Sequence, residues 1–249
     1  MLSWVKAKPW YQRRSRRVAP APASDAAPST PRPETSSLDS RAVDALSGSR
    51  LASLIDTLVS THASVQFIVR KSGSAVKVNQ LWARLAAATE TTTFDWATES
   101  PHALIGVLKR LLRTGSTATV PLTVYEALQS AAADPTTRQP AAVVSALRAL
   151  TEPQLAQLRQ IFKLLTAVAS TPANLMSSTA VGAAIGPSVL CPSLVGTATS
   201  AADLKMVVPG IMSYLIDNAT AFGLDEVATP GPVVRHTFYT AAGRRSTWL

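Results

Sequence analysis

The chain has one cysteine, Cys191, and only three histidines, His62, His102 and His236, which stand far apart along the sequence. A single thiol excludes an internal disulfide and a multi-cysteine zinc site, and it is typical of a protein from a reducing compartment. The histidines do not have the spacing of metal ligands, so no metal site is expected. These absences favour a cytoplasmic protein without a bound metal ion.

Acidic side chains are scarce, because 15 Asp and Glu residues stand against 24 Lys and Arg and give a formal net charge of +9. Paired carboxylates for acid–base chemistry are correspondingly few. Neither a Gly-x-Ser-x-Gly nor a Gly-x-x-x-x-Gly-Lys motif is present, so no stand-alone hydrolase site and no cofactor are expected. The charge favours partners with acidic surfaces, phosphates or anionic lipid. Nucleic acid is not expected, since no recognised nucleic-acid motif accompanies the charge.

Charged residues are absent from residues 164–202. The stretch is interrupted by prolines and glycines and is rich in serine and threonine, so a buried helix followed by a loop explains it better than a membrane span.

The N-terminal segment 1–41 differs in composition from the rest of the chain. Residues 1–17 carry six basic and no acidic side chains among three aromatic ones. This is typical of a solvated basic tail, but contact with an anionic membrane surface and a mitochondrial presequence remain alternatives. Residues 18–40 are mostly Ala, Pro, Ser and Thr, which predicts a disordered linker. The tail 225–249 is expected to be loose.

Between these ends, residues 42–224 are predicted to form one all-α domain. Apolar residues recur at helical spacing from Val43 onward, and no hairpin signal appears. Ser100-Pro101 predicts a helix start ahead of a stripe of leucine and valine, ended by Gly115. The run from Thr151 to Gln154 has capping-box spacing. A last apolar helix is expected from 206 to 222.

Two passages indicate the function. Residues 174–192 read Asn-Leu-Met-Ser-Ser-Thr-Ala-Val-Gly-Ala-Ala-Ile-Gly-Pro-Ser-Val-Leu-Cys-Pro, and residues 67–74 read Phe-Ile-Val-Arg-Lys-Ser-Gly-Ser. The first resembles the signature helix of Rho-type GTPase-activating (RhoGAP) domains, and the second resembles their arginine-finger loop. The matching positions are Arg70, Ser72, Gly73, Ser74, Asn174, Met176, Gly186, Pro187, Leu190 and Pro192.

The resemblance implies a single RhoGAP-like helical domain that completes the active site of a GTP-bound Rho-type small GTPase. It makes Arg70 the catalytic arginine finger, because a guanidinium stays protonated and presents its donors in a fixed fork. It also implies that Lys109 and Arg113 steady the finger loop and contact the GTPase, and that Asn174 belongs to the GTPase-binding set. Lys109 and Arg113 are four residues apart, which places them on one helical face.

The sequence departs from the family pattern at three places. The family's second asparagine falls on Ala180, a proline-containing loop is replaced by residues 114–119, and the glycine before the finger is Phe67. The resemblance is therefore to a divergent member. These departures leave an alternative open, in which the domain is a GTPase-binding or membrane scaffold without activating ability.

Overall fold

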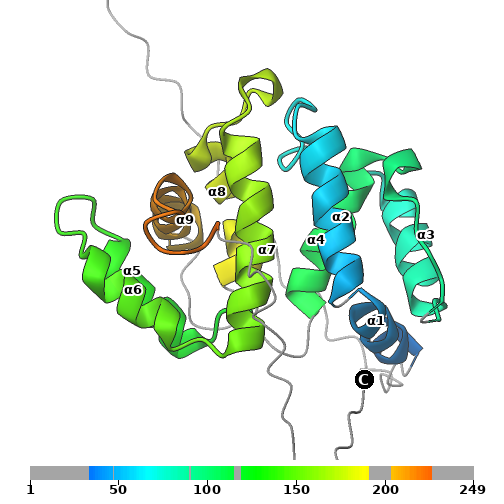
Figure 1. Ribbon diagram of the computed structural model, residues 1–249, viewed down its shortest axis with the longest axis horizontal. Coiled ribbons are helices and arrows are strands. Elements are labelled where there is room, and N and C mark those ends of the chain that lie inside the picture. Colours follow the sequence, from blue (N-terminus) through cyan, green and yellow to red (C-terminus); the bar gives the residue numbers. More distant parts are fainter. Residues whose placement is uncertain (1–33, 47, 90, 115–118, 191–202, 226–249) are drawn as a thin grey trace, which may run out of the picture. The chain divides into compact units, whose positions relative to one another are not determined.

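The computed structural model describes residues 34–46, 48–89, 91–114, 119–190 and 203–225, and all regular elements among them are helices (Figure 1). The α-helices, in chain order, are α1 (Glu34–Ala45), α2 (Ser49–Thr57), α3 (Ala75–Ala86), α4 (Pro101–Thr114), α5 (Leu122–Ala132), α6 (Pro140–Arg148), α7 (Glu152–Ala169), α8 (Ser178–Leu190) and α9 (Val208–Asp217). Short helical turns of other types are η1 (Leu58–His62), η2 (Trp96–Thr98), η3 (Pro172–Asn174) and η4 (Asp203–Val207). The predicted all-α fold is confirmed.

Helix α4 is the central element of the region that contains the candidate functional site. The backbone N–H groups of Ala103 and Leu104 donate to the carbonyl of Ser100, so the helix begins at the predicted Ser-Pro pair. The predicted apolar stripe is buried, and α4 packs on α3, α8 and η1. Its opposite face is left to basic side chains.

Helix α7 begins at the predicted capping box. The N–H of Thr151 donates to the Gln154 side chain over 3.1 Å, which satisfies one of the free donors at this helix end. The helix buries six apolar side chains and packs against α2, α8 and α9. Figure 1 shows it as the long helix beside α2 and α8.

Helices α8 and α9 make the closest helix pair. A Cβ on Gly182 would lie 2.9 Å from the Pro209 carbonyl, and one on Gly186 would lie 2.9 Å from the Met212 side chain, so both glycines permit the approach. The expected helix from 206 to 222 is shorter than predicted. Residues 203–207 form a π-type turn, α9 begins at Val208 with Pro209 in its first turn, and turns follow Asp217.

Helix α1 begins at Glu34, inside the segment predicted to be a linker. The side chain of Ala42 in this helix is fully buried, and so is that of Leu46 in the turn that follows the helix. Asp39 links α1 to the rest of the domain. The Nε1 of Trp82 on α3 donates to Asp39 Oδ1 over 2.8 Å, and Arg110 on α4 pairs with the same oxygen at 2.7 Å. The helical domain therefore extends to the N-terminal side of the expected boundary at residue 42.

Several expectations concern segments outside the described residues. The basic segment 1–17, residues 18–33, Gly115, Cys191 and the tail from residue 226 onward belong to this group. Within the described residues, no helix has both the length and the apolar character to span a membrane.

Candidate functional site

The predicted finger loop connects η1 to α3 and ends at Ser74, the residue before α3. Arg70 lies in it with an exposed side chain, whereas the two preceding residues, Ile68 and Val69, are fully buried. No hydrogen bond or ion pair of the Arg70 side chain is found with the described residues. The loop thus anchors its apolar residues in the core and presents an arginine to solvent.

The loop turns at Phe67, which has a left-handed φ of 55°. Its carbonyl accepts from the N–H groups of both Arg70 and Lys71 at 2.9 Å, so the turn places the arginine directly. A left-handed conformation costs a residue with a Cβ about 1 to 2 kcal/mol, and the family's glycine would avoid this cost. The ammonium of Lys71 lies 5.2 Å from the centre of the Phe67 ring, a contact that glycine could not make.

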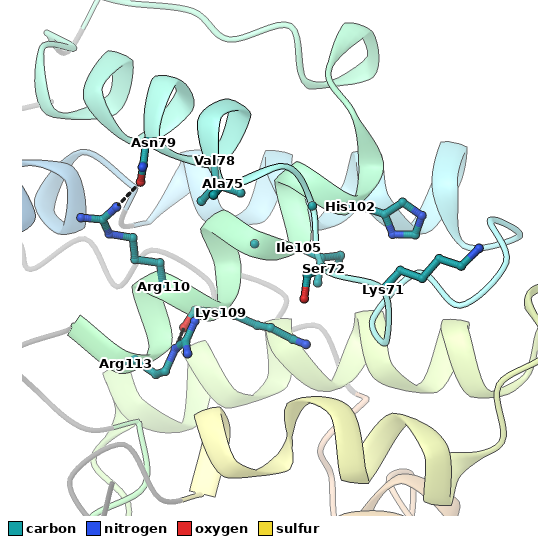
Figure 2. A pocket seen from close by; sticks show the side chains of 12 residues that line it. Lys71, Ser72, Ala75, Val78, Asn79, His102, Ile105, Lys109, Arg110 and Arg113 are labelled. Carbon is teal, nitrogen blue, oxygen red and sulfur yellow. Dashed lines mark hydrogen bonds between the residues drawn. The ribbon is translucent and has the colours of Figure 1, made fainter. Parts of the chain in front are cut away.

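Two side chains of α4 form hydrogen bonds with the backbone of the finger loop. Lys109 Nζ donates to the Val69 carbonyl over 2.7 Å, and His102 Nδ1 donates to the Ile68 carbonyl over 3.2 Å. Figure 2 shows Lys109 and His102 reaching from α4 toward the loop that carries Lys71 and Ser72. Burial, and secondarily the positive charge of Arg113, lowers the pKa of Lys109. Lys109 therefore lies against the finger loop, with its ammonium group bonded to the loop backbone.

Gly73 is the loop residue that lies directly against the first turn of α4. A Cβ at this position would lie 2.5 Å from the His102 carbonyl oxygen and 2.7 Å from the Ala103 nitrogen, both backbone atoms that cannot rotate away. The loop and α4 are thus in direct backbone contact, which explains why a glycine stands here.

We expect Gly73→Ala to lower the free energy of unfolding by about 1 to 3 kcal/mol, because the new methyl group must displace the loop from α4. Gly210→Ala is the matched control. Its Cβ would meet no atom within 4 Å, and alanine is favoured over glycine inside a helix such as α9, so this variant should be at least as stable as the wild type. Guanidinium unfolding curves compare the three proteins, and a Gly73→Ala variant of wild-type stability would contradict the packing.

Asn174 lies where the finger loop meets the connection between α7 and α8. Its side chain is fully buried, and its Nδ2 donates to the carbonyls of Ala63 and Val168, both over 2.7 Å. Its Oδ1 accepts from the N–H of Met176 at 2.9 Å, and its own carbonyl accepts from the N–H of Phe67 at 2.8 Å. The residue joins two chain segments that are distant in sequence.

This burial does not agree with the expectation that Asn174 contacts a GTPase. All of its side-chain donors and acceptors already have partners inside the domain, and no part of the side chain reaches the surface. The residue instead positions the finger loop. The only non-glycine residues with positive φ in the described segments, Phe67 and Leu175, flank this junction, so the backbone strain is concentrated there.

The remaining site residues lie on the surface. Arg113 is exposed on α4, and its Nε donates to the Lys109 carbonyl over 3.0 Å, which leaves the ends of its guanidinium available. Ala180 is half-buried in the first turn of α8, where its methyl side chain can make no hydrogen bond. The sequence predicted that Arg70, Lys109 and Arg113 belong to one site; in the structure Lys109 bonds to Val69, the residue before Arg70, and Arg113 lies one turn further along α4.

Two contributors to this site were not found from the sequence. No role in the site was predicted from the sequence for His102, whose partner is a backbone carbonyl 34 residues away. Arg110 was not selected, although it bonds Asn79 on α3 at 3.0 Å and Asp39 on α1. The sequence signal that could have identified Arg110 was the lack of any acidic residue on this face of α4. Among the described residues no group of His, Cys, Asp and Glu could hold a metal ion.

Comparisons with known proteins agree with this arrangement. The family model described as the RhoGAP domain matches residues 49–193. No curated protein sequence matches the chain significantly.

Two solved structures resemble the fold. Human Rho GTPase activating protein 15 (ARHGAP15) superposes with a TM-score of 0.59 at 19% sequence identity, over 68% of this chain and 81% of that one. The BH domain from GRAF, the GTPase regulator associated with focal adhesion kinase, superposes with a TM-score of 0.57 at 20% identity, over 74% of this chain and 94% of that one. At these identities the likeness concerns the fold. Because the family model covers more than half of the chain, this protein belongs to the RhoGAP domain family.

Proposed function

We propose that this protein stimulates GTP hydrolysis by a Rho-type small GTPase in its GTP-bound form, with Arg70 acting as the arginine finger in trans. One observation carries the proposal: Arg70 is an exposed arginine on a loop whose flanking backbone is fixed at four points. These are the hydrogen bonds of Phe67 to Asn174, of Ile68 to His102, of Val69 to Lys109, and the close contact of Gly73 with α4.

The chemistry requires this combination of a rigid loop and a charged tip. As the bond to the transferred phosphoryl group breaks, negative charge shifts toward the leaving oxygen, and a guanidinium placed beside it lowers the barrier. A loop already fixed before binding loses little entropy when the arginine enters the partner's site. The partner supplies the nucleotide and the residues that orient magnesium and the attacking water.

The roles of the other residues follow from their positions. Lys109 steadies the loop through Val69, and Arg113, exposed one turn further along α4, contacts the GTPase. Asn174 supports the loop from inside the domain and does not touch the partner. A Rho-type partner also implies a cytoplasmic site of action, and the charge of the basic segment 1–17 favours contact with an anionic membrane surface.

A second candidate function is GTPase binding without activation. Ala180 favours it, because a methyl group replaces an amide that in the family contacts the GTPase, and a lost polar contact of this kind is worth about 1 to 3 kcal/mol. The fold would then serve as a scaffold that recognises a GTP-loaded partner.

Single-turnover hydrolysis by a panel of GTP-loaded Rho-type GTPases, with and without the protein, decides between the two functions. Acceleration of one or more members is expected, and binding of the same member should be weaker in its GDP-bound form. Binding to a GTP-loaded GTPase without acceleration would favour the scaffold. The absence of both binding and acceleration across the panel would refute both functions.

A further inference from the structure

A basic cavity lies beside the finger loop, between α3 and α4. It has a volume of about 290 Å³, and its cationic lining residues are Lys71, Lys109, Arg110 and Arg113. No acidic side chain from the described part of the chain lines it. Figure 2 shows three of these cations arising from α4 and Asn79 facing them from α3. The cavity therefore concentrates positive charge in a concave space, where a field is stronger than on a flat surface.

The cations of this cavity are poorly balanced by the protein itself. Among the described residues, Arg110 alone of these cations has a carboxylate partner, Asp39, at 2.7 Å. Lys109 and Arg113 bond to neutral backbone carbonyls, of Val69 and Lys109 respectively. Like charges four residues apart destabilise a helix, and the charge of Arg113 contributes to the lowered pKa of Lys109. An anion between these two side chains would relieve that repulsion.

The floor of the cavity is apolar and closely packed. It is formed by Val78, Ile105 and Gly106, and a Cβ on Gly106 would lie 2.5 Å from Val78 Cγ2, so the glycine permits the close approach of α3 to α4 here. Ser72 and Asn79 add neutral polar groups at the rim. A ligand that combines a compact anionic group with a small ring fits this cavity, because the basic side chains can bind the anion while the ring packs on the apolar floor. The volume is at the lower end of ligand sites and is small for a dinucleotide.

We propose that this cavity binds a phosphate monoester carried on a small polyol ring. Arginine and lysine together recognise phosphate through charge-assisted hydrogen bonds, and the guanidinium fork of Arg113 fits two of its oxygens. A single carboxylate from a protein partner would leave most of the space empty. The phosphate ester can be soluble or can be the headgroup of an anionic lipid, because the cavity would recognise the same chemistry in both.

A bound phosphate ester would occupy Lys109 and Arg113, so it would also inhibit stimulation of a GTPase. This consequence rests on the proposed function, whereas the binding itself does not. Measuring binding in the absence of any GTPase therefore separates a failure of the cavity proposal from a failure of the proposed function.

The test is isothermal titration of the full chain with soluble inositol trisphosphate. Arg113→Gln should weaken binding about tenfold, because it removes a charged donor pair from the cavity. Lys77→Gln is the matched control, since Lys77 is exposed on α3, lines a different cavity and loses the same charge. That variant should bind within about twofold of the wild type, as expected for a remote screened charge.

Vesicles of phosphatidylcholine, with and without phosphatidylinositol bisphosphate, identify the source of the phosphate. If Arg113→Gln, but not Lys77→Gln, reduces sedimentation with the phosphoinositide vesicles, the headgroup enters the cavity. If Arg113→Gln affects only the soluble ligand, the natural ligand is a soluble ester. Absence of binding to both probes, or an equal loss in the two variants, would overturn the proposal, because an equal loss reports only the net charge of the chain.

Discussion

Arg70→Ala is expected to remove most of the stimulation of GTP hydrolysis while the domain stays folded and still binds its partner. The side chain is exposed and makes no hydrogen bond with the described residues, so its truncation leaves nothing unpaired in the core. In the best-studied related system an arginine supplied in trans contributes about 10³ to 10⁵ in rate. A divergent site without the family asparagine at Ala180 is expected to lose a factor toward the lower end of that range.

Single-turnover hydrolysis at saturating protein measures this loss, since it separates the chemical step from binding. Arg70→Lys should recover little, because an ammonium keeps the charge but lacks the planar fork. Arg148→Ala is a suitable control, as Arg148 is also an exposed arginine, in the last turn of α6. Wild-type rates for Arg70→Ala would refute the finger assignment, and equal losses in Arg70→Ala and Arg148→Ala would point to a nonspecific charge effect.

Asn174→Ala is expected to destabilise the domain by about 3 to 5 kcal/mol, a large part of the stability of an ordinary domain. The substitution leaves the carbonyl of Ala63 and the N–H of Met176 without their partners, and it removes one of the two donors to the Val168 carbonyl, which keeps the N–H of Thr171. Each unsatisfied group buried away from water costs about 1 to 3 kcal/mol, partly reduced where water can enter. Because these groups connect the finger loop to the α7–α8 connection, GTPase stimulation should fall as well.

Guanidinium unfolding followed by far-UV circular dichroism measures the change, since loss of helix reports the global transition. Asn218→Ala provides the matched control. That asparagine is half-buried after α9, and its Nδ2 donates only to the Tyr214 carbonyl one turn earlier. Its loss should cost about 0.5 to 1 kcal/mol. A loss of similar size in the two variants would contradict the role assigned to Asn174, as would partner binding that fails in a fully folded Asn174→Ala protein.

Local signals in the sequence predicted the helices well where the cause was itself local. Ser100-Pro101 begins α4, and the capping box at Thr151 begins α7, because both depend on residues within one turn. The composition did not predict α1, which begins at Glu34, before the expected boundary at residue 42. Helix α1 is attached through Asp39 to Trp82 and Arg110, partners 43 and 71 residues away, and the composition of residues 18–40 carries no sign of them.

The contrast between local and long-range interactions also applies to the residues of the candidate site. The spacing of Arg70, Ser72 and Gly73 and the helical separation of Lys109 and Arg113 led to the prediction that they form one site, because a loop motif and a helix face are short-range properties. The sequence could not distinguish a buried asparagine from one that contacts a partner. That difference depends on the hydrogen bond of Asn174 to the Ala63 carbonyl, 111 residues away.

By itself, then, the sequence determined the helical class and the starts of α4 and α7. The tertiary structure alone decided that Asn174 supports the loop from within, that Phe67 turns the chain at a left-handed φ, and that α3 and α4 enclose a basic cavity. The physical reason is the range of the interactions. Capping and amphipathic periodicity act within one or two helical turns, whereas burial and the pairing of buried polar groups depend on which distant segments the fold brings together.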